Sequence, residues 1–343
     1  MNKLLAIYRK DRHIARLVLM IVAWCAFMAI TRFNKFYTVI NFTTMAGQFP
    51  EFGIMALGGM LCMITGGIEL SSVGVANITA ITMGMFMKSQ MNAEGSIGAF
   101  TIVVAFVLAM CLGCLIGCCN GFLISKIKIP PILATLGVNQ LVTGISMVIT
   151  GGNAVSDLPM NYAETINQKL LKIVPGKRGI MQGVLPVQLI FFVVLAVLVW
   201  FLLARTSYGK KIYMIGTNEN VARFSGVKVD QMLIKTYALS GIFAAISGMI
   251  MLANYNSARS DYGSVYTMQC ILIVVLGGVD PKGGRGKISG VLMAIVLLRL
   301  LETGINRFPQ ISSYYITLIY GAVLLLVMVL NYFVDHPIMK KKA

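Results

Sequence analysis

The chain has 343 residues, of which 57% are hydrophobic and 12% are charged, and its mean hydropathy is +0.81. A soluble domain carries about a quarter charged residues, so this composition excludes an ordinary soluble protein. The net charge of +17 does not indicate a nucleic-acid partner, because the basic residues stand at the ends of apolar runs and not in one patch. The sequence therefore predicts an all-α integral membrane protein in contact with lipid.

The N-terminal segment has several basic residues before an apolar stretch from Leu17 to Ile30, as a signal peptide would. The next residues, Thr31-Arg32-Phe33, provide no small-residue cleavage site. We therefore expect an uncleaved first helix.

Apolar runs recur along the whole chain, which we interpret as a single transmembrane domain of residues 1–343. A membrane-spanning helix needs ~20 mostly apolar residues, and ten would use roughly 200. About ten transmembrane helices are predicted, and the runs near 50–66 and 265–280, short and rich in glycine, predict a broken or re-entrant hairpin. The runs are 14–31, 50–66, 71–88, 98–125, 130–150, 183–204, 232–253, 265–280, 288–305 and 314–333.

The basic residues also predict the orientation. With ten crossings and a cytoplasmic start, 19 of the 29 Lys and Arg residues lie in inner segments, nine in outer segments, and Arg299 within a helix. Cytoplasmic loops carry such an excess, so both termini are expected in the cytoplasm. The outer loop 153–182 is expected to be an irregular cap, and its four basic residues are the weakest point of this assignment.

The inner loop 205–231 is basic and contains a helix-like stretch, 218–224. Asn218 can cap the N-terminus of this stretch. A short polar helix between two spans suits contact with a soluble partner.

Catalytic and metal-binding constellations are not found. Cys111 and Cys114 have the C-x-x-C spacing of a zinc or redox site, but small polarisable residues packed inside an apolar helix explain them better. His13 and His336 lie at opposite ends of the chain, and the phosphate loop G-x-x-x-x-G-K-[ST] does not occur. We expect no catalytic residue and no metal site.

Ionisable groups at membrane depth are costly and each needs an explanation. Glu69 either shapes a solute path or anchors a turn by accepting backbone N–H groups, and the second role is favoured. Arg299 and Glu302 are three residues apart and are expected to pair, not to relay protons. The amides of Asn120, Asn139 and Gln140 could bond either a hydroxylated solute or a neighbouring helix.

Small residues at helical spacing, such as Gly113 and Gly117, predict closely packed helices.

Several segments in a fixed order resemble the ribose-type permeases of ATP-binding-cassette (ABC) importers. Residues 64–71, ITGGIELS, are similar to that family's TGGIDLS signature, and residues 120–137 to its NG…IP-x-[IF]-[IV]-ATLG segment. Residues 205–209, 215–226 and 275–278 continue the likeness, which covers roughly 50–330.

The resemblance implies the architecture of a type II ABC importer permease in the bacterial inner membrane. It implies two permeases around one path for a sugar or sugar-like solute, two ATPase subunits on the cytoplasmic face, and an extracytoplasmic solute-binding protein. ATP and magnesium would be used by the ATPase subunits, and no cofactor is expected on this chain. The expected coupling residues are Asn218, Glu219, Ala222, Arg223, Ser225 and Gly226; those of the path or hairpin are Gly66, Gly67, Glu69, Ser71, Asn120, Asn139 and Gln140.

The chain also departs from the family pattern. Glu69 stands where the family usually has Asp, and Ser72 adds a second Ser before Val73. Residues 256–263 resemble permeases of importers with two different permease chains, including those for autoinducer-2. The partner permease is thus either a second copy or a paralogue, and a pentose, a hexose, galactofuranose and autoinducer-2 all stay open as solutes.

Other classes are weighed against this interpretation. An ion- or proton-coupled secondary transporter would need intramembrane acids or a broken-helix ion site. A membrane enzyme would need paired acids and bases, and a scaffold would not need a glycine-rich hairpin.

Overall fold

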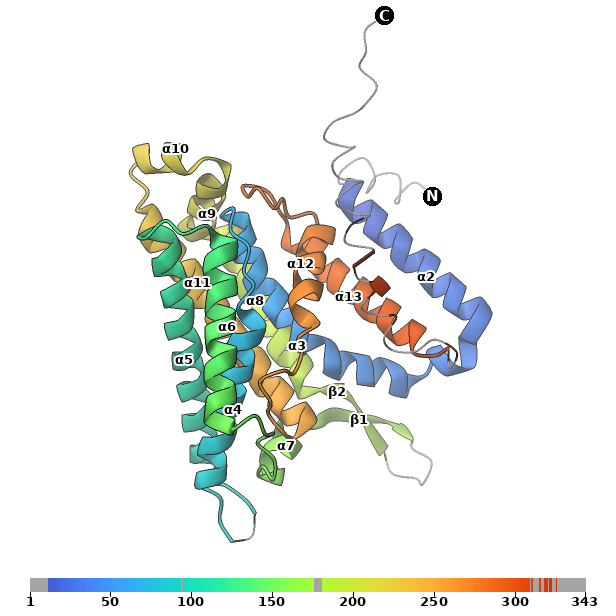
Figure 1. Cartoon of the computed structure of the whole chain (residues 1–343). Helices are drawn as coiled ribbons and strands as arrows, with labels where there is room; N and C mark the ends of the chain where they lie inside the picture. The colour runs from blue at the N-terminus through green and yellow to red at the C-terminus, as the bar shows by residue number, and fades with distance from the viewer. Residues whose placement is uncertain are drawn as a thin grey trace, which may run out of the picture.

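The computed structural model describes residues 12–93, 95–175 and 181–308, with isolated positions between 310 and 325. Most of these residues are helical (Figure 1). The elements are α2 (Arg12–Phe36), α3 (Val39–Ile64), α4 (Ser72–Ser89), α5 (Ala99–Ser125), α6 (Pro131–Thr150), α7 (Met160–Ile166), β1 (Lys169–Pro175), β2 (Met181–Pro186), α8 (Val187–Arg205), α9 (Ser207–Thr217), α10 (Glu219–Phe224), α11 (Val229–Tyr255), α12 (Tyr266–Leu276) and α13 (Ile288–Ile305).

Seven of the described helices are long and apolar enough to cross a bilayer, namely α2, α3, α5, α6, α8, α11 and α13. The prediction of a multi-pass helical membrane protein is confirmed. Two further predicted runs form helices outside this set: α4, whose polar residues lower its hydropathy, and α12, which has 11 residues. The run 314–333 lies almost entirely outside the described residues.

The prediction for residues 50–66 was wrong about the helix start. The run is the second part of α3, a helix of 26 residues that begins at Val39 and contains Pro50. Figure 1 shows that α3 changes direction along its length, and a proline inside a helix causes such bends because it lacks the N–H and crowds the preceding turn. The apolar run thus covers only the part of α3 that follows Pro50.

The loop 153–182 is also more regular than predicted. It holds α7 and the strand β1, which pairs antiparallel with β2, so this segment is not all-α. Tyr162 Oη and Asn167 Nδ2 donate hydrogen bonds of 2.7 Å each to the carbonyl oxygens of Met249 and Ala253, which holds α7 against the end of α11.

Helix α11 lies at the centre of the bundle and is buried along most of its length by α3, α4 and α5. The close approach of α5 depends on glycine. A Cβ at Gly113 would lie 2.5 Å from the carbonyl oxygen of Gly241, and one at Gly117 would lie 2.3 Å from that of Tyr237. The predicted role of Gly113 and Gly117 in close helix packing is confirmed.

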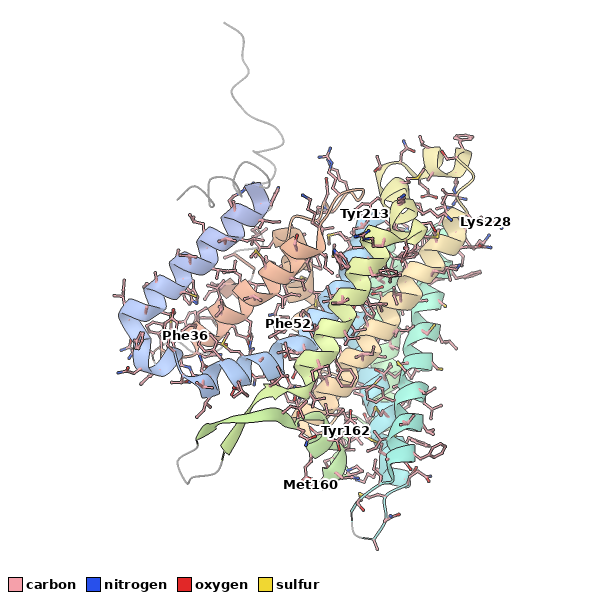
Figure 2. The ribbon with its side chains drawn as sticks, turned by 180° about the vertical axis from the view of Figure 1, so that it is seen from behind. Phe36, Phe52, Met160, Tyr162, Tyr213 and Lys228 are labelled. Carbon is pink, nitrogen blue, oxygen red and sulfur yellow. The ribbon has the colours of Figure 1, made fainter. Side chains whose placement is uncertain are left out.

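The two ends of the bundle carry different structures. Figure 1 shows α9, α10 and the loop between α12 and α13 at one end, and α7 with the β1–β2 hairpin at the other. In Figure 2, Tyr213 and Lys228 mark the first end, and Met160 and Tyr162 mark the second. Loops of functional interest are therefore separated by the length of the helices.

Candidate functional site

The helical path breaks between α3 and α4, in the hairpin of residues 65–71. Gly66 has φ +85°, a conformation that glycine adopts without strain. A Cβ at Gly67 would lie 2.2 Å from the Tyr237 hydroxyl oxygen of α11, so this position has no room for a side chain. The two glycines thus allow the chain to leave α3 and pass close to α11.

Glu69 and Ser71 hold the hairpin from within. Glu69 Oε1 accepts hydrogen bonds from the Ser71 amide at 2.6 Å and from the Ser71 hydroxyl at 2.5 Å. The hydroxyl oxygen in turn accepts from Asn120 Nδ2 of α5 at 2.8 Å. All three residues are buried, so each of these polar groups gains a partner where water is excluded.

Helix α6 holds the same segment from another side. Thr135 Oγ1 donates to the carbonyl oxygen of Ile68 at 3.1 Å, and the Gly74 amide donates to Asn139 Oδ1 at 3.1 Å. Gln140, which was grouped with these residues from the sequence, is exposed on α6. Asn120 and Asn139 therefore bond neighbouring elements in this structure, which was one of the two roles considered for them.

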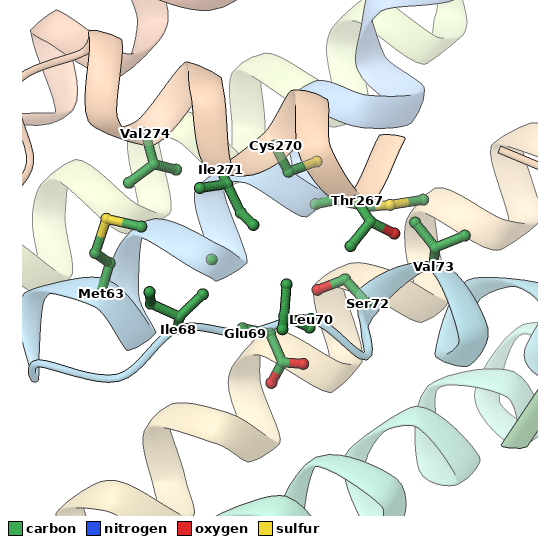
Figure 3. Close-up of a pocket in the computed structure, with 12 residues that line it drawn as sticks. Met63, Ile68, Glu69, Leu70, Ser72, Val73, Thr267, Cys270, Ile271 and Val274 are labelled. Atoms are coloured by element: carbon green, nitrogen blue, oxygen red, sulfur yellow. The ribbon is translucent and has the colours of Figure 1, made fainter. Parts of the chain in front are cut away.

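A pocket lies between the hairpin, α3, the start of α4 and one face of α12. In Figure 3, Leu70 extends toward α12, while the carboxylate of Glu69 points away from it. Residues 67–71 belong to no helix or strand, and within them Leu70 and Glu69 point to different sides (Figure 3). The lining residues are Met55, Gly59, Met63, Ile68, Glu69, Leu70, Ser72, Val73, Thr267, Cys270, Ile271 and Val274.

The lining of the pocket is mostly apolar. Thr267, Cys270, Ile271 and Val274 lie on one face of α12 at helical spacing and are mostly apolar. Ser72 and Thr267 supply hydroxyl groups, and the Glu69 carboxylate is already engaged with Ser71. Few polar groups of the lining are therefore free.

A second buried acid, Glu51, was missed by the sequence analysis. Its side chain is 2% exposed, and its Oε2 accepts from the hydroxyls of Tyr266 at 2.9 Å and Tyr255 at 3.1 Å. Asn254 Nδ2 donates to Oε1 and Gln188 Nε2 donates to Asn254 Oδ1 at 2.7 Å. These five residues, which we call the Glu51 cluster, connect α3, α8, α11 and α12.

The sequence signal for Glu51 was an acid at the very start of an apolar run. The predicted run 50–66 placed this acid next to its boundary, whereas α3 begins at Val39 and includes it.

The loop 205–231 forms two helices, α9 and α10. Asn218 Oδ1 accepts from the Val221 amide at 3.1 Å, so the predicted helix cap is confirmed. Ala222 is buried, whereas Asn218, Glu219, Arg223, Ser225 and Gly226 are exposed at the end of the bundle. The exposed apolar side chains of α10 are Val221 and Phe224, the latter 92% exposed.

Partly exposed ion pairs link α10 to the body of the protein. Glu219 Oε1 lies 3.0 Å from Lys128 Nζ and 2.9 Å from Arg223 Nη2. Arg223 Nη2 also lies 2.5 Å from Asp230 Oδ1, and Lys126 Nζ lies 3.0 Å from Asp230 Oδ2. These five residues, the α10 ion network, join α10 to the α5–α6 loop and to the start of α11.

The charge of Glu219 is stabilised by this network. Partial burial pushes its pKa upward, but hydrogen bonds from Arg223 and Lys128 outweigh that effect and hold the pKa below its ordinary value. Glu219 and Arg223 therefore have partners inside the chain before any soluble partner is considered.

The remaining predictions about chemistry concern cysteines and ion pairs. All seven cysteines are free thiols, and among the described residues no group of three or more His, Cys, Asp or Glu side chains could hold a metal ion. Arg299 Nη1 lies 2.7 Å from Glu302 Oε2, so the predicted ion pair is confirmed.

The sequence of residues 41–328 matches the family described as branched-chain amino acid transport system / permease component. The chain belongs to this family. The matched region of this permease contains the hairpin, all pocket residues and the helices α9 and α10.

Curated relatives agree with this membership. The permease is 32% identical over 297 residues to the ribose import permease protein RbsC of Bacillus subtilis, a match that covers 87% of this chain and 86% of the relative. It is 33% identical over 300 residues to RbsC of Escherichia coli K12, with 87% of each chain covered. It is 31% identical over 300 residues to the autoinducer 2 import system permease protein LsrD of Yersinia enterocolitica, covering 85% of this chain and 82% of the relative. No solved structure matched the chain.

Proposed function

We propose that this permease is the translocation subunit of an ABC importer for a sugar or sugar-like solute. The observation that carries the proposal is the match to import permeases for ribose and for autoinducer 2 over more than four fifths of each chain. The relatives differ in solute, so the proposal extends to the class of hydroxylated small molecules and not to ribose itself.

The proposed assembly contains this permease and three further components besides lipid. A second permease, either a copy or a paralogue, completes the path; two cytoplasmic ATPase subunits use ATP and magnesium; and an extracytoplasmic binding protein delivers the solute. The exposed residues of α10, with Val221 and Phe224 projecting beyond the α10 ion network, form the surface that we assign to the ATPase.

We place the end of the bundle with α9 and α10 in the cytoplasm of a bacterial cell. Lys126, Lys128, Lys210 and Lys211 lie in or beside the segments at this end, which supports an inner location. The start of α2 lies at the same end in Figure 1, in line with a cytoplasmic N-terminus. About ten crossings with a re-entrant hairpin, and a cytoplasmic C-terminus, complete the proposed topology.

In the proposed mechanism, the pocket beside the hairpin is part of the solute path. ATP closes the ATPase pair, the coupling helices move, and the permeases alternate between outward-open and inward-open states. The hairpin is suited to this path because it ends a helix at membrane depth while Glu69, Asn120 and Thr135 satisfy its polar groups.

A secondary transporter that acts alone is the second candidate. It would need acids that are free to take up protons or ions. Glu51, Glu69 and Glu302 each have hydrogen-bond partners in this structure, which disfavours that role.

Uptake in vesicles separates the two candidates. The complex is reconstituted and supplied either with ATP or with a proton or sodium gradient, and entry of labelled ribose and related sugars is followed. The importer requires ATP and gains nothing from a gradient; uptake driven by a gradient without ATP would contradict the proposal.

The role of the pocket is tested with Gly59→Leu. A Cβ at Gly59 meets no atom within 4 Å, so a larger side chain can extend toward the pocket without disturbing the packing around its first atom. Gly144→Leu on α6 is the matched control, because its surroundings are equally open. Gly59→Leu should block uptake and Gly144→Leu should not; unimpaired uptake by Gly59→Leu would exclude this pocket from the path.

A further inference from the structure

Helices α9 and α10 are joined without a linker. Asn218 is the last cap of α9, because its backbone amide donates to the carbonyl oxygen of Met214. It is also the first cap of α10, because its side chain accepts a hydrogen bond from the Val221 amide. A displacement of α10 therefore acts directly on the last turn of α9.

The last turn of α9 touches two other backbones. A Cβ at Gly216 would lie 1.9 Å from the carbonyl oxygen of Ile64 and 2.3 Å from the amide nitrogen of Gly284. The Gly284 amide donates to the Ile64 carbonyl oxygen at 2.8 Å, and a Cβ at Gly283 would lie 2.6 Å from the Gly66 nitrogen. We call Gly66, Gly216, Gly283 and Gly284 the glycine junction.

Two of the three segments of the glycine junction lead to different walls of the pocket. Gly66 begins the hairpin whose residues 68–70 line one wall. Gly283 and Gly284 belong to the loop that follows α12, the other wall. Tyr213 of α9 donates from its hydroxyl to the Gly286 carbonyl oxygen at 2.7 Å, a second link between α9 and that loop.

We propose that the glycine junction carries the movement of α10 to both walls of the pocket, with Gly216 and Tyr213 as positioning residues for transport. The inference rests on the proposed docking of an ATPase on α10. Backbone-to-backbone contacts without side chains cannot absorb a displacement by changing rotamers, so the three segments move together. The α10 ion network is partly exposed and correspondingly weak, so it permits the movement that the junction transmits.

The experiment measures solute transported per ATP hydrolysed by the complete complex of permease, ATPase and binding protein in vesicles. Gly216→Ala should keep the ATPase bound but lower this ratio roughly tenfold, and Tyr213→Phe should lower it about threefold, within the range of mutations that act on coupling. Gly144→Ala, a helix glycine with no neighbour within 4 Å of its Cβ, should leave the ratio unchanged.

An unchanged ratio in assembled Gly216→Ala and Tyr213→Phe complexes would overturn the inference, including one in which ATP hydrolysis and uptake fall in parallel. If Gly216→Ala does not assemble, Tyr213→Phe decides alone, because it removes one hydroxyl and no packing volume. A wild-type complex that binds no ATPase would instead contradict the proposed function and would be seen before any variant is compared.

Discussion

Replacing Glu69 with Leu should destabilise the hairpin, because Glu69 is its internal hydrogen-bond acceptor. The substitution removes the acceptor of two hydrogen bonds, one from the Ser71 amide and one from the Ser71 hydroxyl, in a buried site. A buried donor left without a partner costs about 1–3 kcal/mol, so two donors give roughly 2–6 kcal/mol. The Ser71 hydroxyl can rotate toward another acceptor, so the lower half of this range is expected.

The magnitude is large against a total stability of about 5–15 kcal/mol for a folded domain. Thermal unfolding of the purified permease in detergent measures it, and vesicle uptake reports the consequence for transport. Glu69→Gln keeps a carbonyl acceptor without the charge and should lie between wild type and Glu69→Leu. Glu69→Asp supplies the residue usual in the resembling family and should remain close to wild type.

The reasoning about Glu69 fails if Glu69→Leu unfolds at the wild-type temperature and transports at the wild-type rate. The carboxylate would then not hold the hairpin. A loss of transport with unchanged stability would also contradict it, because Glu69 would then act on the solute directly.

Three further substitutions test other parts of the structure. Gly117→Leu should prevent assembly of α5 on α11, seen as loss of a folded peak in size-exclusion chromatography, because even a Cβ would lie 2.3 Å from the Tyr237 carbonyl oxygen; a well-folded variant would refute this packing. Lys128→Glu puts two acids together and should weaken ATPase coupling, and adding Glu219→Lys should partly restore the coupling. The interaction energy of such an exposed ion pair is up to about 1 kcal/mol. Equal activity of the single and double variants would contradict the contact. Since the pKa of Glu219 lies below its ordinary value of 4.5, this contact stabilises the loop above that pH and is lost only as pH falls below it, which coupling measured between pH 4 and 7 can check. Glu51→Leu should lower the unfolding temperature, because it removes the acceptor shared by the hydroxyls of Tyr255 and Tyr266 and the amide of Asn254. Glu51→Gln, as the milder control, should lower it less, and the opposite order would count against the Glu51 cluster.

Local patterns in the sequence predicted local structure well. The Asn218 cap, the Arg299–Glu302 pair and the close packing at Gly113 and Gly117 each depend on spacing along one helix, which the sequence displays directly. The family resemblance added the order of the motifs, and it agrees with the match over residues 41–328.

Contacts between distant segments were beyond the sequence. Glu51 accepts from Tyr266, 215 positions away, and Gly216 approaches Gly284 only because α9 and the loop after α12 meet at one end of the bundle. The start of α3 was also beyond the sequence, because the segment from Val39 to Gln48 is not a continuous apolar run and the helix continues through Pro50.

The most direct measurement of the central claim is a pull-down of this permease from its native membrane in a gentle detergent, with mass spectrometry of the bound proteins. We predict that an ATPase subunit is recovered, and that the presence or absence of a second permease sequence decides between a heterodimer and a homodimer. Recovery of the permease alone, together with solute transport in vesicles without ATP, would contradict the assignment to an ABC importer.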